Sequence, residues 1–210
     1  NYGAVGNDYR ITKYEVTNAQ YVEFLNAVDP TGNNPLDLYS SIMTSDNVRG
    51  GIDYDNTASN GSRYSSKADF DDKPVNYVSW FSAARFTNWL QNGQGNGDTE
   101  TGAYTLLGGT PTPSNATTIT RNTDAKHFLP KQDEWYKAAY YDSNTTTDSL
   151  YPTQNSTAPA AATANASGDI DNSGMNVANY DENANWNGSS SDPVVQGNVT
   201  TVGSAGVMSE

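Results

Sequence analysis

Apolar residues recur at helical spacing in three separate stretches of an otherwise polar chain. Thr17 and Gln20 are spaced as a capping box before the first stretch, and Pro30 and Gly32 follow it as helix-ending residues. A looser alternation over residues 9–16 predicts a strand ahead of this helix. The apolar residues of the helix fall at i, i+3, i+4 and i+7, and therefore on one face: Tyr21, Phe24, Leu25 and Val28.

The second stretch predicts a short strand followed by a helix. Val75 and Tyr77 alternate with polar residues, and Ser79 is a plausible N-cap. Gly93 is suited to the position that follows the end of the helix. The expected buried stripe consists of Ala83, Phe86, Trp89 and Leu90.

The third stretch reads "HFLPKQDEWYKAAYY", residues 127–141. Phe128 and Leu129 are expected to end a strand that Pro130 breaks. Asp133 and Glu134 then lie in the first turn of a helix, where the helix dipole favours negative charge. The apolar side chains of one helix face are Trp135, Ala138 and Ala139, and we expect Trp135 to pack the helix on the core.

Long polar segments separate these stretches, over residues 31–72, 93–126 and 143–174. Only 35% of residues are hydrophobic, but charged residues are only 17%, and 14 Tyr and 4 Trp supply large amphipathic side chains. Such long loops argue against a simple layered fold. They favour a loop-rich scaffold, and we expect residues 1–210 to form a single domain.

The charge and the missing cysteines exclude several classes of function. A net charge of −13 opposes binding to phosphate backbones, so nucleic acid is not an expected partner. The absence of cysteine removes disulfides, thiolate metal sites and a cysteine nucleophile. No apolar run reaches the roughly 18 residues of a membrane span. Acidic, oxygen-rich loops do suit calcium.

Together, the three stretches resemble the formylglycine-generating enzyme (sulfatase-modifying factor) family in order and spacing. The similarity is carried by the blocks "YEVTNAQYVEFLNAV", "KPVNYVSWFSAARFTNWL" and "FLPKQDEWYKAAYY", and it covers roughly residues 9–204. The resemblance implies an α+β, C-type-lectin-like fold, rich in loops, with about three helices and short antiparallel strands.

The chain departs from the family pattern where the family's chemistry is located. In the resembled enzyme, two copper-binding cysteines follow a G-G-N-x-W-E-W block, whereas this chain has no cysteine and ends at "TTVGSAGVMSE". We therefore expect a domain that is incomplete at its C-terminus, has no copper site and is a non-catalytic binding or structural protein. The alternative is a copper oxidase whose cysteines lie beyond Glu210. A third reading makes the chain one piece of a multi-chain protein.

The resemblance also implies a calcium site. The expected ligands are the Asn179 side chain, the Tyr180 carbonyl, the Asp192 carboxylate and the Val194 carbonyl, a mixture of oxygens that calcium accepts. A rival calcium loop, "DIDNSGMNVANY", begins at Asp169 and resembles an EF-hand loop. It has a tyrosine in place of glutamate at its twelfth position, so the match is weak.

Other candidate groups have structural readings. His127 is the single histidine, and without a nucleophile-elbow motif it is interpreted as a strand-edge residue. Asp133 and Glu134 are adjacent, so they point apart on a helix and complement its dipole instead of forming a catalytic pair. The Gly-rich run 93–98 follows a helix and lacks lysine, which makes it a turn and not a phosphate loop.

Aromatic residues in the loops are the best candidates for contacts with a partner. Tyrosine and tryptophan on rigid loops lose little rotamer entropy when they bind. The expected partners are a carbohydrate, a protein or further copies of the chain, as in a filament or surface layer, for a secreted or cell-surface protein of bacterial type. The residues singled out are Tyr39, Tyr54, Tyr64 and Trp186.

Overall fold

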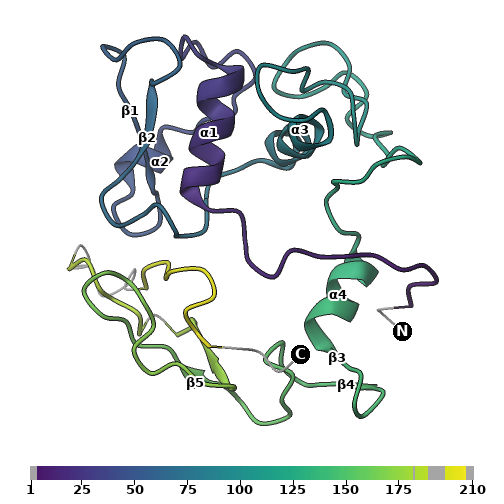
Figure 1. The fold of residues 1–210 in the computed structure, drawn as a ribbon, viewed down its shortest axis with the longest axis vertical. Helices are drawn as coiled ribbons and strands as arrows, with labels where there is room; N and C mark the ends of the chain where they lie inside the picture. Colours follow the sequence, from purple (N-terminus) through teal and green to yellow (C-terminus); the bar gives the residue numbers. More distant parts are fainter. Residues whose placement is uncertain (1–3, 182, 189–196, 207–210) are drawn as a thin grey trace. The chain divides into compact units, whose positions relative to one another are not determined.

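The computed structural model describes residues 4–181, 183–188 and 197–206, which form two compact units. The central unit runs from Val16 to Leu129, and the terminal unit combines the residues before Val16 with those after Leu129. Each unit combines at least one helix with at least one short strand pair, so the fold is α+β, as predicted (Figure 1).

The central unit is built around one helix, α1 (Asn18–Val28). On one side of it lies an antiparallel hairpin of β1 (Ile52–Tyr54) and β2 (Tyr64–Ser66), and on the other lies α3 (Trp80–Gln91) (Figure 1). The short helix α2 (Ile42–Ser45) leads into the hairpin. Helix α1 therefore supplies the surface on which both neighbours pack.

The predicted apolar faces of α1 and α3 meet in an aromatic core. Phe24 packs edge-on against Phe86 and Trp89, with ring centroids 5.4 Å apart in both pairs. The capping box is confirmed, because Thr17 Oγ1 accepts from the Gln20 N–H at 3.3 Å and Gln20 Oε1 accepts from the Thr17 N–H at 3.0 Å. Local spacing thus predicted both the face and the start of α1.

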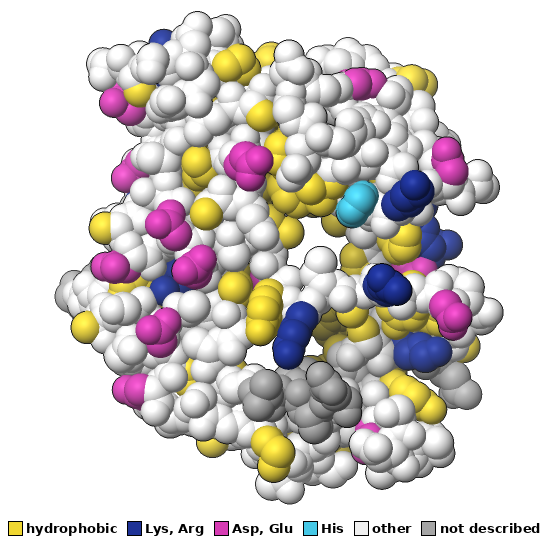
Figure 2. Space-filling view, viewed as in Figure 1, with side chains coloured by type: hydrophobic (Ala, Val, Ile, Leu, Met, Phe, Trp, Pro, Cys, Tyr) yellow, Lys and Arg dark blue, Asp and Glu magenta, His cyan; other side chains and the backbone are white. Residues whose placement is uncertain are grey.

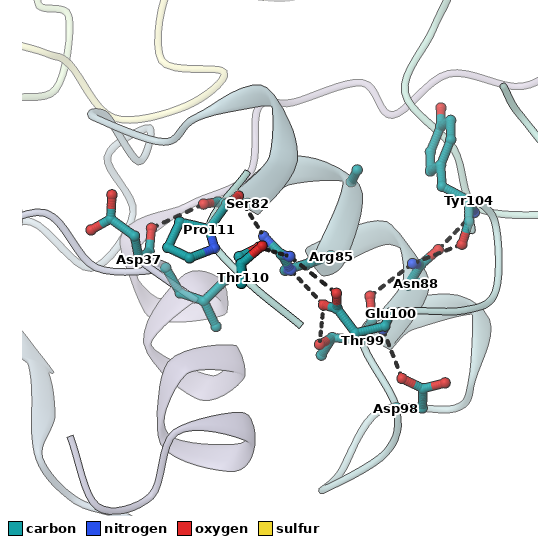
Figure 3. Close-up of polar contacts among 12 residues, drawn as sticks. Asp37, Ser82, Arg85, Asn88, Asp98, Thr99, Glu100, Tyr104, Thr110 and Pro111 are labelled. Carbon is teal, nitrogen blue, oxygen red and sulfur yellow. Dashed lines mark hydrogen bonds and ion pairs between the residues drawn. The ribbon is translucent and has the colours of Figure 1, made fainter. Parts of the chain in front are cut away.

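Helix α3 is buried on a second face that carries polar side chains. Arg85 is fully buried and forms an ion pair with Glu100, Nε to Oε1, at 2.5 Å (Figure 3). Asn88, also fully buried, donates to the Thr99 and Tyr104 carbonyls and accepts from the Tyr104 N–H at 2.8 Å. The predicted apolar stripe therefore describes only one of the two buried faces of α3. The other face, through Arg85 and Asn88, holds the loop over residues 98–111.

The terminal unit contains α4 and two strand pairs. Helix α4 (Gln132–Tyr140) continues into an antiparallel pair of β3 (Tyr141–Asp142) and β4 (Thr147–Asp148). The second pair, β5 (Ala160–Ala161) and β6 (Val177–Ala178), is parallel. Among the described residues, none of the helices has the length and apolar character needed to cross a bilayer.

The packing predicted for α4 is wrong. Trp135 is 50% exposed, whereas Glu134 is only 3% exposed. Glu134 Oε2 accepts from the Lys131 N–H at 2.8 Å, and the Glu134 carbonyl accepts from the Tyr9 hydroxyl at 2.6 Å. The helix is therefore held through its acidic first turn, whose location was predicted, and not through its tryptophan.

The three strands predicted ahead of the helices are also wrong. Segments 9–16, 75–79 and 128–129 form no strand, although Thr17 and Pro74 make an isolated antiparallel bridge. A positive φ of 63° at Tyr77 ends the extended run there. His127 lies exposed in a bend and not at a strand edge.

Candidate functional site

Three tyrosines that the sequence analysis singled out converge in the central unit. Tyr54 and Tyr64 are direct partners in the β1–β2 hairpin, and their ring centroids lie 5.4 Å apart. Tyr39, from the loop after α1, packs against both at 5.9 and 5.3 Å. Tyr64 is 3% exposed and Tyr54 is 36% exposed, so the cluster reaches from the core to the surface.

These rings form one wall of a pocket of about 380 Å³. Small-molecule sites in proteins usually occupy roughly 300–1,000 Å³. All lining residues belong to the central unit: Gly32, Asn34, Asp37, Tyr39, Ser40, Ser41, Tyr54 and Tyr64.

Each tyrosine hydroxyl of the wall has a partner within the protein. Tyr54 donates to the Gly32 carbonyl at 3.2 Å, and the Tyr39 hydroxyl lies 2.5 Å from Thr44 Oγ1. Tyr64 donates to the buried carboxylate of Asp29. Burial first, and then this hydrogen bond, raises the pKa of Tyr64 well above its usual value, so it remains a donor. The rings are therefore fixed at both ends.

The loop over residues 34–39 is held by side chains that replace backbone partners. Asn34 Oδ1 accepts from the Leu38 and Tyr39 N–H groups, at 2.8 and 3.1 Å, and Asn34 Nδ2 donates to the Tyr39 carbonyl at 2.7 Å. Ser82 Oγ of α3 donates to the Asp37 carbonyl at 3.2 Å (Figure 3). Both Asn34 and Asp37 have positive φ, 50° and 52°, which asparagine and aspartate tolerate better than most residues.

Two polar groups of the pocket remain available to a ligand. Within the described part of the chain, neither the Asp37 carboxylate nor the Ser41 hydroxyl makes a hydrogen bond, and both residues are exposed. No lysine or arginine is among the lining residues. The pocket thus combines a rigid aromatic wall with a free carboxylate and a free hydroxyl.

A comparison with protein families identifies the family of this chain. A family model described as "Sulfatase-modifying factor enzyme 1-like domain" matches residues 4–202. The chain belongs to this family. The match spans parts of both units, and comparisons with curated proteins and with solved structures gave no match.

Two of the four residues predicted to bind calcium, Asn179 and Tyr180, lie within the described part of the chain. Asn179 Nδ2 donates to the Asn198 carbonyl at 2.9 Å and to Thr200 Oγ1 at 3.3 Å. This leaves Asn179 Oδ1 without a hydrogen bond from any described residue. The other two expected ligands, Asp192 and Val194, lie outside the described residues.

The carboxylates of the rival calcium loop are bound to protein hydroxyls. Asp169 Oδ1 accepts from Thr201 Oγ1 at 2.7 Å, and Asp171 accepts from Thr163 Oγ1. Over residues 4–181, 183–188 and 197–206, no group of three or more His, Cys, Asp or Glu side chains is placed to share an ion. Threonines on either side of the loop, Thr163 and Thr201, therefore hydrogen-bond to its carboxylates.

Trp186, the fourth aromatic residue chosen for partner contact, is half-buried in the terminal unit. Its indole N–H donates to the Val199 carbonyl at 2.8 Å, and its backbone N–H donates to Asn198 Oδ1 at 3.0 Å. These bonds show a role in fixing the local loop, and a contact between Trp186 and a partner stays a prediction.

Sequence reasoning missed the polar half of the pocket. Asp37 and Asn34 lie in a stretch, "GNNPLDLY", whose turn residues indicated only a loop. This loop packs beside the β1–β2 hairpin through contacts between residues far apart in sequence, and a local sequence pattern does not predict such contacts. The excess of tyrosine was the one usable indication.

Proposed function

We propose that this sulfatase-modifying-factor-family chain is a secreted, non-catalytic binding protein whose ligand occupies the tyrosine pocket. The observation that carries the proposal is the rigid wall of Tyr39, Tyr54 and Tyr64 beside the free carboxylate of Asp37. A wall that is already ordered loses little conformational freedom on binding, which favours affinity.

The chemistry of the pocket supports binding over catalysis. Asp37 is the only carboxylate among the lining residues, whereas acid–base hydrolysis commonly uses two that converge on one bond. Ser40 and Ser41 line the pocket without a histidine or lysine beside them to act as a base. The groups present are suited to stacking and hydrogen bonding.

A direct test is an NMR titration of backbone amides with a mixed panel of saccharides, organic ammonium compounds and short peptides. We expect at least one class to shift the amide signals of residues 32–41 together with those of Tyr54 and Tyr64. A panel that leaves all of these signals in place would overturn the pocket as a binding site. Light scattering in parallel would reveal self-association, the remaining expected mode of contact.

The family match favours one second candidate, a copper oxidase of which this chain supplies only the scaffold. The chain itself holds no cysteine, so the copper ligands would have to come from elsewhere in the native protein. Intact mass and C-terminal peptide mapping of the native protein decide between the two. A paired-cysteine segment beyond Glu210 supports the oxidase, and a native end at Glu210 supports the binding protein.

We further propose that one calcium ion is held by Asn179 Oδ1 and the Tyr180 carbonyl together with Asp192 and Val194. The orientation of the Asn179 amide supports this, because its nitrogen is used within the protein and its oxygen is not. A ligand that binds only the folded state raises the melting temperature. Calcium should therefore raise Tm relative to EGTA, and Asp192→Asn should abolish the difference, whereas the control Asp148→Asn should retain it.

A further inference from the structure

We infer that the tyrosine pocket takes a neutral carbohydrate, with a sugar ring stacked on the exposed face of Tyr54. This inference rests on the proposed function and narrows it to one class of ligand. It follows from the geometry of the rings, from the polar groups beside them and from the sign of the charge.

The three rings form a wall and not a cage. Their centroids lie 5.3 to 5.9 Å apart, within the 4.5–7 Å range at which aromatic rings touch one another. An organic cation such as choline binds best when several ring faces surround it, and here the rings pack against one another at interplanar angles of 38 to 50°. A flat ligand that covers one open face fits this arrangement, and Tyr54 is the most exposed of the three.

Stacking on such a face suits the ring of a sugar. The face of a tyrosine ring is electron-rich, and the C–H bonds of a pyranose carry a small positive charge, so the two surfaces attract each other. The hydroxyl of Tyr54 is bonded to Gly32, and the ring is thereby held in the orientation in which it is exposed. Ligand binding needs no reordering of this side chain.

The polar lining offers both donors and acceptors, as sugar hydroxyls require. Each sugar hydroxyl donates one hydrogen bond and accepts others, whereas an ammonium group only donates. The Asp37 carboxylate accepts, and the Ser41 hydroxyl both donates and accepts. A pocket of about 380 Å³ also exceeds what a single ammonium head would fill.

The charge of the protein selects against acidic glycans. The chain carries 24 acidic and 11 basic residues, and acidic side chains are spread over the visible face of the molecule (Figure 2). A uronic acid in the pocket would face Asp37 with no lysine or arginine in the lining to compensate for the repulsion. A neutral sugar carries no charge, so Asp37 does not repel it.

Isothermal titration of the full chain tests the inference with defined probes. The neutral probes are maltotriose, cellotriose, mannotriose and chitotriose, the acidic probe is trigalacturonate, and the cationic probe is choline. We expect at least one neutral trisaccharide to bind, with affinity above those for trigalacturonate and choline. The same trisaccharide, added in an NMR titration, should shift the amide signals of residues 32–41 and thereby locate the binding in this pocket.

Matched variants identify the groups responsible. Tyr54→Ala should weaken binding by roughly tenfold or more, as for an aromatic anchor, whereas Tyr54→Phe keeps the ring and should stay within about threefold. Asp37→Asn keeps the shape and the tolerance for positive φ, should weaken neutral-sugar binding severalfold and should reduce the discrimination against trigalacturonate. The control is Tyr14→Ala, which should leave trisaccharide binding unchanged, because Tyr14 is 48% exposed and is not among the residues that line the pocket.

Each outcome has one meaning. Choline or a peptide that binds where no neutral trisaccharide does would overturn the carbohydrate inference and leave the pocket's binding function in place. If none of these probes binds, and no class in the mixed NMR panel binds, both the carbohydrate inference and the proposed binding function are overturned. Trisaccharide binding that survives Tyr54→Ala and Asp37→Asn would place the sugar elsewhere and overturn the inference. Asp37 is exposed, so its variant remains informative even if Tyr54→Ala folds poorly.

Discussion

Replacing Glu100 by glutamine tests how the loop over residues 98–111 is held against α3. Glu100 pairs with Arg85 through two hydrogen bonds, Nε to Oε1 at 2.5 Å and Nη2 to Oε2 at 3.1 Å. Arg85 also donates to the Thr110 carbonyl at 2.8 Å and to the Pro111 carbonyl at 3.2 Å (Figure 3). The substitution keeps the size of the side chain but removes the one charge that, among the described residues, is paired with the fully buried Arg85 guanidinium.

The magnitude follows from the burial of the two partners. Breaking a fully buried ion pair costs about 3–5 kcal/mol, because one charge is left buried and unpaired. Here the Arg85 side chain is 0% exposed and that of Glu100 is 23% exposed, so solvent screens part of the interaction. The two backbone carbonyls and the glutamine oxygen also still accept from Arg85. We therefore expect a loss of about 2–3 kcal/mol in the free energy of unfolding.

Urea denaturation followed by tryptophan fluorescence measures this loss. For a chain of this size, each kcal/mol corresponds to about 2–4 °C in Tm, so calorimetry gives an independent value. The control is Glu23→Gln, an exposed glutamate of α1, which should stay within about 0.5 kcal/mol of the parent. A loss below about 0.5 kcal/mol for Glu100→Gln would refute the assignment of Arg85 as the anchor of this loop.

Three further predictions concern the cap of α1, the pocket and the acid range. Thr17→Ala should lower the free energy of unfolding by about 1 kcal/mol in urea denaturation, because it removes the N-cap hydrogen bond of α1. Gly32→Ala should cost about 1–2 kcal/mol by the same measurement and weaken trisaccharide binding, because Gly32 has a φ of 70° and an added Cβ would lie 2.5 Å from Tyr54 Cε2. Burial acts to raise the pKa of Asp46, but hydrogen bonds, first from Tyr77, lower it below 3.8. Its contribution to stability is therefore present above about pH 4 and lost as the pH falls further, so unfolding curves of the parent and Asp46→Asn should converge in acid.

The parts of the fold that the sequence predicted are those that depend on neighbours within one or two helical turns. The capping box of Thr17 and Gln20 and the Ser79 cap were recognisable because each involves residues three apart. Trp135 was misjudged because its spacing indicates a helix face without indicating what that face meets. In the structure, α4 is held through Glu134 instead, whose carbonyl accepts a hydrogen bond from the Tyr9 hydroxyl.

The candidate site was predictable only in its aromatic half. Tyrosine enrichment singled out Tyr39, Tyr54 and Tyr64, and the hairpin register placed Tyr54 directly opposite Tyr64. Asp37 was missed because its backbone is placed by Ser82, a residue 45 positions further along the chain. A contact at that separation follows from the packing of α1 and α3, which no local pattern reports.

Asparagine side chains hold several of the loops of this polar chain in place. Asn26 pairs with both backbone groups of Tyr64, donating to its carbonyl at 2.8 Å and accepting from its N–H at 3.0 Å, as a neighbouring strand would. Asn34 and Asn88 do the same for the backbone of residues 38–39 and 99–104. Because a buried backbone group without a partner is costly, these side chains supply the hydrogen bonds that a neighbouring strand would otherwise provide. The asparagines that make the sequence polar therefore hold the backbone of Tyr39 and of Tyr64 in place.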